Sequence, residues 1–154
     1  MSSCAWRAQI VGLVLASVTV FAATIASAHV RVMPAESQLG ATETYKVTVP
    51  TEGKVATTKV ELILPLGVEL VSIDDAGKPY DVRKGEAGIS IITWRGEILP
   101  GWARIYGFTV RNPQAGAELS WKAHQIFADG STADWVDAPD SKRPASVTKL
   151  VAAP

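Results

Sequence analysis

The chain has 154 residues, enough for one domain, and its 15 basic and 15 acidic residues give a net charge of zero. This balance provides no strong electrostatic attraction to nucleic acid or to an anionic membrane. The single cysteine, Cys4, lies near the start of the chain. The rest of the chain can therefore form neither a disulfide nor a thiolate metal site.

The first 28 residues resemble a secretory signal peptide. Arg7 supplies a positive charge, residues 10–26 are almost wholly apolar, and Ala26-Ser27-Ala28 is the small-x-small pattern that signal peptidase accepts. The apolar run is shorter than the roughly 20 residues of a membrane span, so an uncleaved anchor is the less favoured alternative. We therefore expect a signal peptide over 1–28 and a domain over 29–151. The mature protein would start at His29, be periplasmic or secreted, and have no membrane anchor.

Short strands separated by turn residues follow along the chain. Alternating apolar and polar residues and β-branched content predict strands over 30–33, 44–49, 58–64, 68–73, 89–94, 104–111, 119–127, 133–136 and 146–151. Residues 74–88 are expected to form a loop with one edge strand. Asp129-Gly130 is a typical hairpin turn. Since no segment shows a helical repeat, we predict an all-β fold, an antiparallel β-sandwich.

His29 directly follows the expected cleavage site. A free N-terminal histidine offers two nitrogen donors, its α-amine and its ring Nδ1, which together close a six-membered chelate ring on a metal. Copper(II) favours such donors, although binding must displace the proton of an α-amine whose ordinary pKa is about 8. The alternative is a histidine left on a frayed chain end. The residues alone leave both interpretations open.

A third copper ligand would be a carboxylate. Copper(I) prefers sulfur, and Met33 is the one methionine after the expected cut, so copper(II) is the favoured state. Glu61 stands among apolar residues of a predicted strand, where a carboxylate needs a cationic partner. Alternation favours instead a solvent-facing Glu61 beside Lys59. Glu97 is a weaker candidate and is expected to be a loop charge.

The tryptophans and the second histidine can also be interpreted without a metal. Trp94 and Trp121 lie on predicted strands and are expected in the core, and Trp102 lies in a turn. Composition does not single out Trp135. His124 could be a second ligand of a two-histidine brace, but a hydrogen-bonded strand histidine is the default. We find no nucleophile motif and no phosphate-binding loop.

The order and spacing of several short motifs resemble the YcnI-like copper-binding domain family. The motifs span most of the expected mature chain: His29-Val30-Arg31-Val32-Met33-Pro34, Gly40, Val49-Pro50, Ala56-Thr57-Thr58-Lys59-Val60-Glu61, Leu64-Pro65-Leu66-Gly67-Val68, Ile92-Thr93-Trp94, Ile98-Leu99-Pro100-Gly101, Phe108, Trp121-Lys122-Ala123, Gln125 and Asp129-Gly130 through Trp135.

The resemblance implies an immunoglobulin- or fibronectin-III-like sandwich that binds one copper(II). The ligands would be the amine and ring of His29 and the carboxylate of Glu61, and Trp135 would lie near the metal. Many family members carry a C-terminal anchor or a copper-chaperone domain, and neither is expected here. Trp102 stands where relatives often have an acidic residue, so any help from that carboxylate would be missing.

These observations predict an exported copper-binding protein of copper homeostasis, used in trafficking, delivery or storage, and not an enzyme. Its partners would be the copper ion and a copper chaperone or copper-acceptor membrane protein, and not nucleic acid. One alternative is a copper oxidase or oxygenase with His29 and His124 as a two-histidine brace. Another is a metal-free structural or adhesion sandwich, because such a fold hosts many functions.

Overall fold

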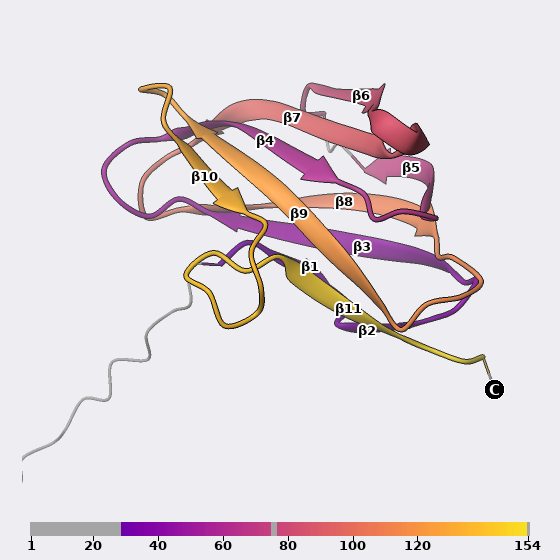
Figure 1. Ribbon diagram of the computed structural model, residues 1–154. Coiled ribbons are helices and arrows are strands. Elements are labelled where there is room, and N and C mark those ends of the chain that lie inside the picture. The colour runs from indigo at the N-terminus through magenta and orange to yellow at the C-terminus, as the bar shows by residue number, and fades with distance from the viewer. Residues whose placement is uncertain (1–28, 75–76, 154) are drawn as a thin grey trace, which may run out of the picture.

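The computed structural model describes residues 29–74 and 77–153, which form two packed β-sheets (Figure 1). The expected signal peptide, residues 1–28, lies outside the described residues. The strands are β1 (Arg31–Met33), β2 (Glu36–Gln38), β3 (Thr42–Pro50), β4 (Thr57–Ile63), β5 (Glu69–Asp74), β6 (Tyr80–Lys84), β7 (Ser90–Ile98), β8 (Ala103–Arg111), β9 (Glu118–Phe127), β10 (Thr132–Trp135) and β11 (Ser146–Val151). Within the described part of the chain, no helix is long and apolar enough to cross a membrane.

The smaller sheet has four strands in the order β1-β3-β8-β5. The larger sheet has seven strands, in the order β2-β11-β9-β4-β7-β6, and β10 pairs with β9 beside this path. Among the described strands, every pairing is antiparallel except that of β11 with β2. The predicted all-β antiparallel sandwich is therefore confirmed, with one parallel exception.

Aromatic rings fill the space between the sheets. Trp94 and Trp121 are almost completely buried, as the sequence predicts. The ring centroids of Tyr45 and Trp121 lie 4.8 Å apart, and those of Trp94 and Tyr106 lie 4.7 Å apart. Because these pairs join residues of both sheets, they hold the two layers together, and each large apolar side chain buried in this way contributes about 1.5–3 kcal/mol.

The β9–β10 hairpin confirms the turn predicted at Asp129-Gly130. The amide of Phe127 donates to the Ser131 carbonyl at 2.9 Å, and Gly130 has a φ of +83°, so residues 128–130 form a three-residue loop. The Asp129 carboxylate accepts bonds from the hydroxyl and the amide of Ser131, at 2.6 and 2.9 Å, and these bonds lower the pKa of that carboxyl. The hairpin places Trp135, at the end of β10, beside the central strand β9.

Candidate metal site

The chain that carries His29 is clamped at the edge of the sandwich. The side chains of Val30 and Val32 are buried between the sheets. The amide of Val32 donates to the Ser146 hydroxyl oxygen at 2.9 Å, and that hydroxyl donates to the Val32 carbonyl at 3.5 Å. β1 is thus fastened to β11 as well as to β3. Half-buried His29 is therefore presented by a pinned segment and not by a frayed end.

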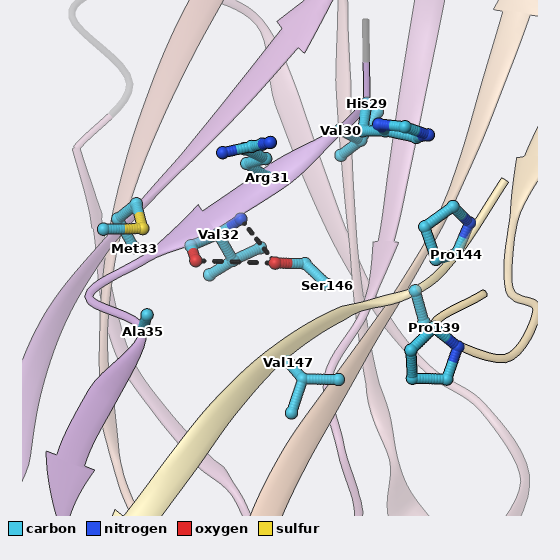
Figure 2. A pocket seen from close by; sticks show the side chains of 11 residues that line it. His29, Val30, Arg31, Val32, Met33, Ala35, Pro139, Pro144, Ser146 and Val147 are labelled. Atoms are coloured by element: carbon cyan, nitrogen blue, oxygen red, sulfur yellow. Dashed lines mark hydrogen bonds between the residues drawn. The ribbon is translucent and has the colours of Figure 1, made fainter. Parts of the chain in front are cut away.

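The ring of His29 packs against the indole of Trp135. Their centroids lie 5.6 Å apart with an interplanar angle of 82°, an edge-on arrangement. Beside His29 opens a hollow of about 410 Å³ between β1 and the start of β11, where Figure 2 shows the surrounding side chains. Its lining is largely apolar or neutral and includes Met33, Pro139, Pro144 and Ser146. The His29 imidazole therefore contacts the Trp135 indole and also borders this hollow.

A buried amide, that of Gln125, links the surroundings of His29. Gln125 Oε1 accepts a bond from Trp135 Nε1 at 3.2 Å, and Gln125 Nε2 lies 2.8 Å from the Pro50 carbonyl and 2.6 Å from Thr57 Oγ1. Arg31 of β1 pairs with Thr48 of β3. Continuing this register by two residues places His29 opposite Pro50. One side chain therefore holds both the indole beside His29 and the strand opposite it.

Glu61 points away from this arrangement. Its neighbours on β4, Val60 and Leu62, face the core, so by strand alternation Glu61 faces the outside of the larger sheet. Its carboxylate oxygens lie 3.2 Å from Lys59 Nζ and 3.7 Å from Arg83 Nη2. Lys59 and Arg83 therefore provide the positive charge that this half-buried carboxylate needs.

The structure brings His29 and Trp135 together and does not bring Glu61 to them. Trp135 faces the inside of the sandwich, as does Ala123 opposite it on β9, whereas Glu61 faces the outside. Glu61 is therefore not part of the His29–Trp135 arrangement in this structure, and its role as a copper ligand stays a prediction. The physical reason is that apolar residues on either side of Glu61 occupy the core and leave it the opposite face.

His124 also lies on the outer face. It stands opposite Glu61 on β4 and opposite Asp134 on β10, and its Nδ1 lies 2.6 Å from Asp134 Oδ1. It is therefore a hydrogen-bonded strand histidine, and the geometry does not pair it with His29. Among residues 29–74 and 77–153, no group of three or more His, Cys, Asp and Glu side chains could hold a metal ion.

Sequence reasoning missed the role of Gln125. Gln125 is a buried polar residue of β9, a strand in which exposed and buried residues alternate. Its two neighbours, His124 and Ile126, are less buried than it is. Every second residue of β9, Leu119, Trp121 and Ala123, is apolar and buried. Continuing this alternation to residue 125 predicts that Gln125 is buried as well. Its three bonding partners could not, because they lie on three other strands, β3, β4 and β10.

Solved structures with a similar architecture support the fold. An uncharacterized protein from Nocardia farcinica with an immunoglobulin-like fold matches with a TM-score of 0.66 and 22% identity, covering 80% of this chain and 99% of that one. A non-cellulosomal cohesin from Archaeoglobus fulgidus matches with a TM-score of 0.50 and 13% identity, covering 80% and 91% of the two chains. At such identities the likeness shows an immunoglobulin-like fold and nothing about function.

Sequence comparison identifies the family. A family model described as a domain of unknown function, DUF1775, matches residues 29–150. The copper-binding protein CutI of Bacillus subtilis (strain 168) is 36% identical over 132 residues, a match that covers 83% of this chain. The match spans 65% of the length of CutI. The chain therefore belongs to the DUF1775 family, the YcnI-like family that its motifs resemble.

Proposed function

We propose that this chain is an exported copper(II)-binding protein that serves copper trafficking, delivery or storage. The ion would be held by the α-amine and Nδ1 of His29, with Trp135 packed beside the ring. Support comes from the similarity to CutI, which is named a copper-binding protein, and from the signal-peptide pattern that ends at Ala28. The observation that carries the proposal is the contact between the His29 ring and the Trp135 indole at the start of a pinned strand.

The donor chemistry fits a copper(II) cargo. Amine and imidazole nitrogens are donors that copper(II) favours, and a histidine on a clamped strand loses little conformational freedom when it binds. The described residues assemble no group of three His, Cys, Asp and Glu side chains that could complete a cage. The remaining copper positions would be filled by water or by a ligand from a partner. This suits an ion that is handed to a copper chaperone or to a copper-acceptor membrane protein.

The test compares a protein that begins at His29 with the same protein acetylated on its α-amine. Acetylation turns the amine into an amide and adds no new amine, so we expect copper(II) affinity to fall about 100-fold or more. Competition with a chelator of known affinity measures the change, and electron paramagnetic resonance reports the loss of a nitrogen donor. Equal affinities for the two proteins would contradict the proposal. Mass spectrometry of the exported protein should find His29 as the first residue.

Matched variants locate the ligands. We expect His29→Ala to abolish tight binding and His124→Ala to leave it unchanged, because His124 is held by Asp134 on the outer face. Glu61→Gln tests the ligand role that the family resemblance implies. The outward position of Glu61 predicts an unchanged affinity, whereas a clear fall would restore Glu61 as a ligand.

A further inference from the structure

An exposed arginine lies beside the proposed copper ligand on the same segment of chain. Arg31 follows His29 by two residues, and Val30 between them is buried in the core. By strand alternation His29 and Arg31 share a side of the chain, and two residues of extended backbone separate their Cα atoms by about 6.6 Å. Both line the hollow of about 410 Å³, and Figure 2 shows Arg31 between His29 and Met33 along β1.

The charge of this hollow is positive. Arg31 lines it, and no acidic side chain of the described residues does. Three other hollows of the surface each include a carboxylate, from Glu97, from Glu69, or from Glu36 and Glu43. Within residues 29–74 and 77–153, the ion pairs join other cations to carboxylates and leave Arg31 without an acidic partner. The hollow beside His29 is therefore suited to an anion.

A guanidinium next to a copper site needs a physical reason. Copper(II) held by His29 and the Arg31 guanidinium would repel each other, since both are cations at short range. An anion that contacts both would remove this repulsion. Carboxylate oxygens are ligands that copper(II) accepts, and a guanidinium pairs with two carboxylate oxygens through parallel hydrogen bonds. His29 supplies only two donors, so copper positions remain for such an anion.

We infer that the hollow binds a small dicarboxylate, of the size and charge of oxalate, together with the copper ion. Two of its oxygens bind the copper on His29, and the other two accept hydrogen bonds from Arg31. A free amino acid fits less well, because it has one oxygen left for the guanidinium once it chelates copper. The inference rests on the proposed function and specifies its cargo as a copper carboxylate complex. A volume of about 410 Å³ is ample for this ligand.

Equilibrium dialysis of radiolabelled oxalate against the copper-loaded protein that begins at His29 tests the inference. The wild type should bind one oxalate per copper, and Arg31→Gln should weaken this binding about 10-fold through loss of the charged hydrogen bonds. Arg31→Lys should lie between the two, because lysine keeps the charge but not the planar fork. Electron paramagnetic resonance checks that copper keeps its nitrogen donors in each sample.

Arg111→Gln is the matched control for these variants. Arg111 is exposed like Arg31, but it pairs with Thr42, at the end of β3 away from Pro50 and His29. Its replacement removes one positive charge from the surface and none from the hollow. We therefore expect Arg111→Gln to bind oxalate as the wild type does.

The copper affinity provides a second measurement with an opposite sign. Without oxalate, Arg31→Gln should bind copper(II) at least as tightly as the wild type, because the repulsive cation is gone. With oxalate present, the wild type should bind copper more tightly than the variant. Chelator competition with and without oxalate measures both orders. A merely structural role of Arg31 would weaken copper binding under both conditions.

Two results would overturn the dicarboxylate site. One is a copper-loaded wild type that binds no oxalate. The other is equal oxalate binding by the wild type and Arg31→Gln, which would show that oxalate only completes the copper coordination and does not use the hollow. The acetylation test of the copper proposal contains no oxalate. Failure of the proposed function and failure of the dicarboxylate site are therefore distinguishable.

Discussion

At the scale of single residues, Gln125 holds the surroundings of His29 in place. Its side chain is buried, and its amide satisfies the Trp135 indole, the Pro50 carbonyl and the Thr57 hydroxyl at once. Polar groups removed from water need such partners, and a network that is fully bonded holds its members in one arrangement. We regard Gln125 as the positioning residue of the His29–Trp135 contact.

Replacing Gln125 with methionine tests this role. The variant keeps much of the volume but leaves the three buried partners with fewer bonds, so we expect it to lose about 2–4 kcal/mol of unfolding free energy. Urea unfolding measures the loss. Gln38→Met, at an exposed glutamine, should change stability by less than about 0.5 kcal/mol. A Gln125→Met variant as stable as this control would show that the buried bonds are dispensable.

At the scale of the elements, local pattern predicts every described strand except β2. Nine predicted strands overlap β1, β3, β4, β5, β7, β8, β9, β10 and β11, and the edge strand expected within 74–88 is β6. β2 was not predicted because it has three residues with only Ser37 buried, which gives no apolar alternation. It exists through parallel pairing with β11, with Lys149 opposite Glu36. The short 3-10 helix Glu86–Gly88 was also not predicted.

The β9–β10 hairpin depends on the conformation of one glycine. Gly130 has a φ of +83°, and a Cβ added there would meet no atom within 4 Å. The cost of Gly130→Ala is therefore backbone strain alone, and we expect a loss of about 1–2 kcal/mol. Gly130→Asn should lose less, because asparagine tolerates this conformation better. Thermal or urea unfolding measures both variants, and equal losses would argue against left-handed backbone strain as the source of the cost.

At the scale of the whole molecule, burial of tyrosines between the sheets couples stability to alkaline pH. Burial raises the pKa of Tyr45 and of Tyr106 above the usual value of tyrosine, and neighbouring groups such as Asn112 and Arg104 offset only part of this. A group whose pKa is higher in the folded protein than in the unfolded chain contributes its full stabilisation at pH values below the pKa in the unfolded chain, which is about 10 for tyrosine. That contribution is lost as the pH rises toward the raised value, because the unfolded chain ionises first.

We therefore expect the unfolding free energy to fall above about pH 10, with each buried tyrosine adding a slope of at most about 1.4 kcal/mol per pH unit. Tyr45→Phe and Tyr106→Phe should each make the fall shallower. Urea unfolding at a series of alkaline pH values provides the slopes, and Tyr80→Phe, at an exposed tyrosine, serves as the matched control. If neither buried variant changed the slope, the alkaline loss would have another origin.

The sequence by itself determined the strand pattern, the burial of Trp94 and Trp121, the Asp129-Gly130 hairpin and the family, because alternation, turn chemistry and motif spacing are local properties of the chain. It also pointed to His29, whose chemistry depends only on its place after the expected cut. Only the tertiary structure decided which residues meet. Strand register sets Trp135 beside His29 and turns Glu61 to the far face, and register arises from pairings between segments that are distant in the chain.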